Sequence, residues 1–168
     1  SYLTNNLETK HSANFIKKNK KDLKKDFEFI SLHISNQNNE KTKDFSIGDT
    51  VNIKLKIKNS SKEKNIDIGI QIKSDDDVPV FHIMARDSNY KLVLNKPEET
   101  FLISLEDIRL FPGVYSINLT CTNLTGHQIF DHISDALSFE ITDGGMYTSR
   151  SLPKAAGQFF LNPTWIKL

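Results

Sequence analysis

The stretch Ile108–Asn123, IRLFPGVYSINLTCTN, decides the fold. It opens on the turn sequence Phe111-Pro112-Gly113, and the side chains then alternate in character. Because the side chains of a β-strand point to opposite faces with a period of two, this alternation predicts a strand with one dry face and one polar face. The dry face carries Tyr115, Ile117, Leu119 and Cys121, and the other face carries Val114, Ser116, Asn118 and Thr120.

Other segments of the chain repeat this alternation. Val51–Lys58 places an apolar side chain at every second position, and Ile66–Lys73 does so with four isoleucines. Short segments of this kind, bounded by turn residues and without a convincing helix, are typical of sandwiches. The sequence therefore predicts an all-β fold, a jelly-roll or immunoglobulin-like antiparallel β-sandwich. The further predicted strands are Phe27–Ile34, Val78–Ala85, Tyr90–Leu94, Phe101–Leu105, Gln128–Asp131 and Ala136–Thr142, followed by a last apolar piece, Gln158–Leu168.

Charge is distributed unevenly along the 168 residues, a length that suits one ordinary domain. Residues 1–26 carry seven lysines and a net charge of +4, whereas residues 27–168 carry a net charge of −3. We expect residues 1–26 to be a basic polar linker and residues 27–168 to form the sandwich. A contact of the linker with a membrane surface or RNA is the alternative. The overall charge of +1 argues against a nucleic-acid partner held by bulk electrostatics.

Cys121 is the single cysteine, and it falls on the predicted dry face. We therefore expect a buried structural thiol and no disulfide within the chain. One unpaired cysteine, without an apolar signal segment before it, favours a cytoplasmic location. No apolar run approaches the length of about 18–20 residues that a membrane-spanning helix needs.

Catalytic and metal-binding signatures are weak. The sequence has no Gly-rich phosphate loop, no G-x-S-x-G and no H-E-x-x-H. His127 and His132 lie near Asp131 and Asp135, but their spacing matches no standard metal site. Asp75-Asp76-Asp77 lacks the glycine of a calcium loop. We expect polar loops at both places, with no metal site and no cofactor.

Binding of a sugar requires polar side chains for its hydroxyl groups and an aromatic face for the apolar side of the ring. Tyr147 or Trp165 could supply the aromatic face. Polar outward residues are also the default of an antiparallel sheet in water, so an ordinary solvated face remains the alternative. If these residues bind sugar, replacing Gln71 or Asn118 by alanine should weaken binding without unfolding the domain, with a stability change within about 0.5 kcal/mol, because both side chains point away from the predicted core. The candidate sugar-binding side chains are Asp67, Gln71, His82, Ser116, Asn118 and Thr120.

Several short motifs follow one another in an informative order. Leu110–Ile117, LFPGVYSI, is followed by Asp131–Ile141, DHISDALSFEI, and by an ending at Gly157–Trp165. Phe45–Val51 and the Ile68-Gly69-Ile70 strand precede them. In this order, residues 27–165 resemble the C-terminal carbohydrate-binding domain of Wzt, the ATPase subunit of ABC transporters that export O-antigen polysaccharide. Asp75-Asp76-Asp77 departs from the D-x-D-G turn that relatives often have.

That resemblance implies a non-catalytic module that recognises the modified non-reducing end of an O-antigen polysaccharide and selects it for export. It implies that an ATPase domain precedes Ser1 and connects the module to the membrane permease, at the cytoplasmic face of the inner membrane. It also implies a homodimer in which the C-terminal strand is exchanged between protomers. The residues of the exchanged strand would be Phe159, Phe160, Leu161 and Trp165.

Two other classes of function stay open. The chain could be a structural or adhesin-type β-sandwich that binds a protein partner through the apolar edge Phe159-Phe160-Leu161. It could also be an enzyme that uses Asp131, His132 and Asp135. The sequence names neither the glycan nor its terminal modification, and it does not say which sheet forms the binding face.

Overall fold

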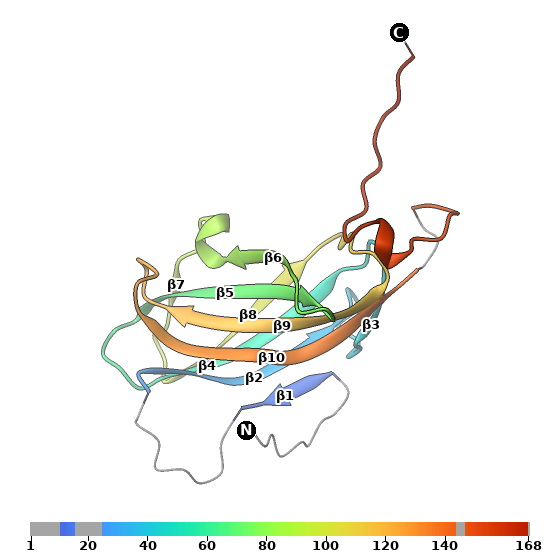
Figure 1. Ribbon diagram of the computed structural model, residues 1–168. Coiled ribbons are helices and arrows are strands. Elements are labelled where there is room, and N and C mark those ends of the chain that lie inside the picture. The colour runs from blue at the N-terminus through green and yellow to red at the C-terminus, as the bar shows by residue number, and fades with distance from the viewer. Residues whose placement is uncertain (1–10, 16–24, 144–146, 168) are drawn as a thin grey trace.

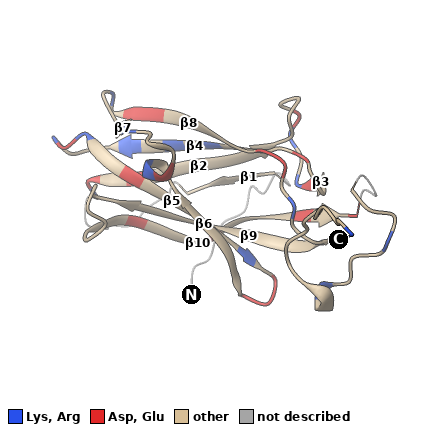
Figure 2. Cartoon of the chain, turned by 90° about the horizontal axis from the view of Figure 1, so that it is seen from above, with Lys and Arg blue, Asp and Glu red and all other residues tan. Residues whose placement is uncertain are grey.

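Two β-sheets pack face to face in the computed structural model, which describes residues 11–15, 25–143 and 147–167 (Figure 1). Seen from above, the sheets form two separate layers (Figure 2). This arrangement confirms the predicted all-β sandwich. None of the helices in the described part of the chain is long and apolar enough to cross a membrane.

The smaller sheet contains four strands in the order β1-β2-β4-β8, and each neighbouring pair is antiparallel. Alternation in β4 sends four apolar side chains into the sandwich and leaves three lysines on the outer face. The bounds of these strands are β1, Ser12–Asn14; β2, Phe27–Ser35; β4, Val51–Asn59; and β8, Glu98–Leu105.

The larger sheet has the order β3-β10-β9-β5-β6, and the short strand β7 pairs with β5 beside β6. All of its pairs are antiparallel except β3 with β10. Two 3-10 turns, η1 at Ala85–Ser88 and η2 at Lys154–Ala156, lie outside the sheets. The bounds of its strands are β3, Asp44–Ser46; β5, Asn65–Ser74; β6, Pro79–Met84; β7, Leu92–Val93; β9, Gly113–Thr122; and β10, Ile129–Thr142.

Strand β9 is the stretch from which the fold was predicted, and it lies between β10 and β5. Tyr115, Ile117, Leu119 and Cys121 are all buried on its inner face. The ring of Tyr115 stacks on Phe139 of β10 with centroids 5.8 Å apart, and its hydroxyl donates to the carbonyl of Phe111 over 2.7 Å. The dry face predicted from the alternation is therefore confirmed.

Both ends of the chain differ in part from the prediction. β1 lies within residues 1–26, which we expected to be linker, and it pairs with β2; the other linker residues that the structure describes are 11, 15, 25 and 26. The apolar piece Gln158–Leu168 forms no strand over its described residues. It is fixed by an isolated bridge from Phe159 to Leu110, and the chain then runs away from the sandwich (Figure 1).

Phe160 is buried within its own chain and packs beside Tyr147, with ring centroids 6.1 Å apart. Its backbone N–H donates to the carbonyl of Arg109 over 2.7 Å. Of the four residues expected in strand exchange, Phe160 thus belongs to the core of its own protomer. Phe159, Leu161 and Trp165 are exposed, and Trp165 is 90% accessible.

Candidate functional site

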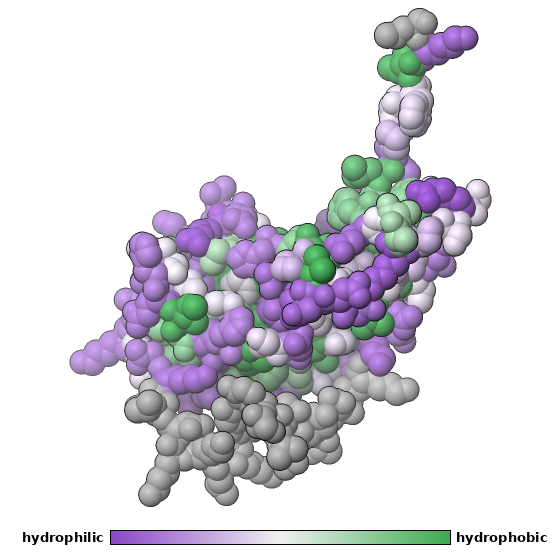
Figure 3. All heavy atoms as spheres, viewed as in Figure 1, coloured by the Kyte–Doolittle hydropathy of each residue, from purple (hydrophilic) through white to green (hydrophobic). Residues whose placement is uncertain are grey.

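The outer face of the larger sheet, which faces the viewer in Figure 1, brings the six candidate sugar-binding residues together. Gln71 of β5 lies directly opposite His82 of β6 on one side and Asn118 of β9 on the other. The neighbouring row places Thr120 opposite His132 of β10. Figure 3 shows this side of the molecule as mostly hydrophilic. We call this surface the polar face.

Asn118 is held in place by two hydrogen bonds. Its amide nitrogen donates to Oε1 of Gln71 over 3.0 Å, and its oxygen accepts from the backbone N–H of Asp135 over 2.8 Å. The side chain points away from the core, as predicted, but it is only 8% exposed. The structure therefore favours a destabilising Asn118→Ala substitution over a nearly neutral one, because two hydrogen-bonding partners would lose their bonds.

Asp67 lies near the start of β5, opposite Thr122 of β9, and is 2% exposed. Its Oδ2 forms an ion pair with Nε of Arg86 at 3.1 Å, and its Oδ1 accepts from the backbone N–H of Ile68 over 3.0 Å. Arg86 also donates to the carbonyl of Leu124, so its side chain lies across this end of the sheet. Asp67 thus orients Arg86 and is itself covered.

The position of the His82 ring depends on the absence of a side chain at Gly69. A Cβ atom at Gly69, which follows Ile68 on β5, would lie 2.8 Å from Nε2 of His82. The imidazole therefore rests on the backbone of β5, where a side chain would otherwise stand, and it stays exposed on the polar face. The isoleucine alternation of β5 placed Gly69 outward but gave no sign of this contact.

His132 and Ser134 of β10 extend the polar face beyond the predicted set. Nδ1 of His132 lies 2.9 Å from Oγ1 of Thr120, and its Nε2 lies 3.0 Å from Oγ of Ser134. Alternation about Ile133 could have identified both residues, since it sends them to the side opposite that apolar side chain. Thr120, His132 and Ser134 form one hydrogen-bonded chain at the surface.

Lys73 joins two loops at the edge of the polar face. Its ammonium group forms ion pairs with Asp77, in the β5–β6 loop, and with Asp135, in a bulge of β10, at 3.3 Å for the latter. A hydrogen bond from Ser116 and the charge of Lys73 hold the pKa of Asp135 below its usual range. Asp77 raises the pKa of Lys73. The two loops are therefore held side by side.

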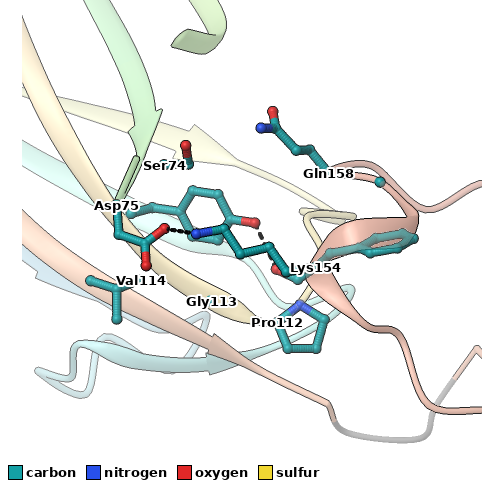
Figure 4. Close-up of a pocket in the computed structure, with 10 residues that line it drawn as sticks. Ser74, Asp75, Pro112, Gly113, Val114, Lys154 and Gln158 are labelled. Atoms are coloured by element: carbon teal, nitrogen blue, oxygen red, sulfur yellow. Dashed lines mark hydrogen bonds and ion pairs between the residues drawn. The ribbon is translucent and has the colours of Figure 1, made fainter. Parts of the chain in front are cut away.

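The β5–β6 loop is also tied to the C-terminal segment. Lys154 of η2 pairs with Asp75 and, at 2.7 Å, with Asp76; Figure 4 shows the first contact. The pocket beneath Lys154 has a volume of about 10 Å³, which suits a water molecule and not a sugar ring. The aspartate triplet thus forms ion pairs with lysines. In the described residues no group of three or more His, Cys, Asp or Glu is arranged to hold a metal ion.

Neither aromatic residue proposed for sugar stacking lies on the polar face. The hydroxyl of Tyr147 donates to Asp107 over 2.7 Å, and the guanidinium of Arg109 lies 4.5 Å from the centre of its ring. Trp165 belongs to the segment that leaves the sandwich. Tyr147 is therefore engaged elsewhere.

The three residues of the enzyme alternative are separated. Asp131 points into the sandwich, where its Oδ2 accepts from the backbone N–H of Phe29 of β2 over 2.9 Å. His132 faces the other way, and Asp135 pairs with Lys73. Asp131 therefore links the two sheets and is not placed to act with His132 on a substrate.

Comparison with known proteins places the chain in a family. The model of the Wzt C-terminal domain matches residues 22–152. The crystal structure of the C-terminal domain of Wzt superimposes with a TM-score of 0.71, covering 86% of each chain at 14% identity, which shows the same fold. A β-glucuronidase from glycoside hydrolase family 2 matches 61% of this chain and 10% of its own with a TM-score of 0.41 and 15% identity, a likeness too slight to argue from. No curated protein matches by sequence. Since the family model covers well over half of the residues, the chain belongs to the Wzt C-terminal domain family.

Proposed function

We propose that the chain is a non-catalytic carbohydrate-binding module that recognises the non-reducing end of an O-antigen polysaccharide for export by an ABC transporter. Its membership of the Wzt C-terminal domain family supports the transporter context. The observation that carries the proposal is the polar face, where uncharged hydrogen-bonding groups from four neighbouring strands lie on one surface.

The groups on the polar face match the chemistry of sugar hydroxyls. Hydroxyl groups donate and accept hydrogen bonds, and so do the amide of Gln71, the hydroxyl of Thr120 and the rings of His82 and His132. These four side chains are exposed or half-buried. Asn118 and Asp67 are covered, so they contribute by positioning neighbouring groups. Asn118 holds Gln71 and the β10 bulge in place, and Asp67 holds Arg86. Ser116 acts through Asp135.

Specific binding of one polysaccharide tests this proposal. The purified chain is titrated with the O-polysaccharide of its own source and with an unrelated one, by calorimetry. We expect saturable binding of the first only. Equal binding of both, or binding of neither, contradicts the proposed function.

Variants then test whether the polar face is the binding surface. His132→Ala removes a hydrogen-bonding ring, and Gly69→Ala displaces the ring of His82. Each should weaken binding by about fivefold to thirtyfold, as expected for the loss of one or two hydrogen bonds. Thr100→Ala, at an exposed position on the outer face of the smaller sheet, is the matched control and should bind as the parent does. Full affinity in both polar-face variants would exclude this surface.

The exposed C-terminal segment supports a second part of the proposal, a homodimer formed by exchange of this segment. Leu161, Trp165 and Ile166 are exposed by 70%, 90% and 77%, a dense set of apolar side chains for a free surface. A groove of about 310 Å³ lies beside Phe159, between Phe81 of β6 and Leu105 of β8. Residues 161–167 of a second copy could cover apolar surface there.

Solution mass tests the dimer. Sedimentation of the chain at micromolar concentration should give twice the monomer mass, and Trp165→Ser with Ile166→Ser should shift it to the monomer. A parent chain that is monomeric would contradict exchange. A monomer whose segment instead captures a defined protein partner would favour the structural or adhesin-type alternative.

The transporter context extends the proposal to location and partners. An ATPase domain and a membrane permease are the expected partners, which places the module at the cytoplasmic face of the inner membrane. The buried thiol of Cys121 accords with a reducing compartment. Co-purification of the permease with the full-length protein is the direct check, and its failure in mild detergent would contradict this part of the proposal.

A further inference from the structure

The outer face of the smaller sheet gathers basic side chains at one end. His33 of β2 lies directly opposite Lys54 of β4 and, on its other side, opposite Ser12 of β1. Lys41 forms an isolated bridge with Ser35, two residues beyond His33 on the same strand. His11 precedes β1, and its carbonyl accepts from the backbone N–H of Ile34 over 3.0 Å. Two lysines and two histidines therefore lie near one another on this face, close enough for the charges of the other three to act on His33.

No acidic side chain in the described part of the chain pairs with this cluster. Among the residues that the structure describes, neither Lys41 nor Lys54 forms an ion pair, and no carboxylate pairs with His11 or His33. Like charges opposite one another on a sheet repel. The cluster therefore carries positive charge that the described part of the chain leaves unopposed.

The other end of the same strand is different. Lys56 pairs with Glu98 of β8, and Lys58 lies between Glu28 and Glu98 in register. Lys54 and Lys58 stand four residues apart on the same face of β4. Charge on β4 is thus compensated at Lys56 and Lys58, toward the end of the strand, and uncompensated within the described residues at Lys54.

His33 adds an unmet hydrogen bond to the unopposed charge. Its Nδ1 is buried and has no hydrogen-bonding partner. Burial, together with the charges of Lys41, Lys54 and His11, lowers the pKa of His33. These are the charged groups that face it from β4, from the segment before β3 and from the residue before β1. An anion bound among these groups would offset their mutual repulsion and favour the protonated ring.

We propose that His33, Lys41, Lys54 and His11 form a binding site for a phosphate group. A phosphate oxyanion presents several acceptor oxygens around one centre, and lysine ammonium and imidazolium groups offer only donors. A group of this size can contact both lysines and the ring at once. The site lies on the outer face of the smaller sheet, whereas the polar face belongs to the larger one, so it is independent of glycan recognition.

Titration of the imidazole signals tests the site. The ¹⁵N-labelled chain is followed by NMR from acid to neutral pH in inorganic phosphate and in chloride of equal ionic strength. We expect phosphate to raise the pKa of His33, because a bound anion favours the protonated ring. An unchanged His33 titration in phosphate overturns the proposal.

Matched variants separate a site from general screening. Lys54→Gln should raise the phosphate concentration that gives half of the change in the His33 pKa by about tenfold, since the site loses one of its two ammonium donors. Lys58→Gln removes the same charge from the same face of the same strand and should leave the effect intact. An equal loss in both variants means that phosphate acts only through the overall charge, which also overturns the proposal. Both substitutions are at exposed positions, so the fold should be retained.

A lipid arm distinguishes the source of the phosphate group. Vesicles of phosphatidylcholine with phosphatidylglycerol are compared with vesicles of phosphatidylcholine alone. Lys54-dependent binding to the anionic vesicles, together with a weak effect of free phosphate, would assign the site to a lipid headgroup. A strong effect of inorganic phosphate without vesicle binding would assign it to a soluble phosphate. The glycan titration is unaffected by either outcome, so failure here does not bear on the proposed function.

Discussion

The side-chain oxygen of Asn118 on β9 accepts a 2.8 Å hydrogen bond from the backbone N–H of Asp135 on β10. Asp135 has a positive φ of 49° and lies where the register of β10 slips between Ile133 and Leu137. A residue in the left-handed region with an N–H that no ladder bond satisfies needs such a partner. Asn118 therefore fixes the bulge that carries Ser134 and Asp135 onto the polar face.

Replacing Asn118 by alanine should destabilise the domain by about 1–3 kcal/mol, because the N–H of Asp135 loses its acceptor. Urea unfolding followed by circular dichroism measures this free energy. Ser138→Ala, at an exposed position on β10, is the control and should stay within about 0.5 kcal/mol of the parent. Equal stability of the two variants would show that the bond contributes nothing to the fold.

Asp131 should matter as a link between the sheets. Asp131→Ala should lower the free energy of unfolding by about 2–3 kcal/mol, since the backbone N–H groups of Phe29 and His132 lose a charged acceptor and the ion pair with Lys25 is lost. Asp131→Asn keeps one acceptor oxygen and should lose less. Urea unfolding ranks the stability of the parent and the two variants. If Asp131→Ala is more stable than Asp131→Asn, the assigned role is contradicted.

Two neighbouring phenylalanines, Phe159 and Phe160, should contribute very differently to the stability of the domain. Phe160 is 5% exposed, so Phe160→Ala should cost about 3–5 kcal/mol. Phe159 is 53% exposed, and Phe159→Ala should cost about 1 kcal/mol or less. Thermal unfolding at low protein concentration, where any dimer is dissociated, makes the comparison. If Phe160→Ala is harmless there, the side chain finds its burial in a partner and not in its own chain.

Cys121 should be chemically silent in the folded domain. Burial, with the charges of Asp131 and Asp67 added, raises the pKa of its thiol to about 12. The reactive thiolate is therefore almost absent at pH 8 and would form only as the pH approaches that value. Iodoacetamide should label the native protein at pH 8 only after urea is added. The variant Ser138→Cys supplies an exposed thiol as a positive control, and rapid labelling of the parent would show that the inner face opens.

Much of the sandwich could be predicted from the sequence because alternation is strong in its central strands. β4, β5 and β9 each place apolar side chains at every second position, and all three lie inside a sheet. The three-residue strand β1 escaped prediction because a segment so short shows no period. Its pairing with β2 depends on contacts between residues distant in the sequence, which no local pattern records.

The candidate site was predictable in its location but not in its detail. Period-two alternation tells which face a side chain takes, and it correctly gathered Gln71, Asn118 and Thr120. It does not tell what lies across that face. Arg86 covers Asp67, and the β10 bulge covers Asn118. Neither contact could be predicted from alternation, because the position of Arg86 and the shape of the bulge depend on tertiary contacts. Whether a polar residue binds a ligand or supports a neighbour that does is decided at that level.

Gly69 shows how such a surface can change during evolution. Because the ring of His82 occupies the space above this residue, a single methyl group there would move the imidazole without touching any hydrogen bond of the sheet. The nearest atom belongs to an exposed side chain that can swing aside, so the fold would tolerate the change. If the polar face binds the glycan as proposed, a change of sugar specificity would need only a mutation at a residue that offers no functional group of its own.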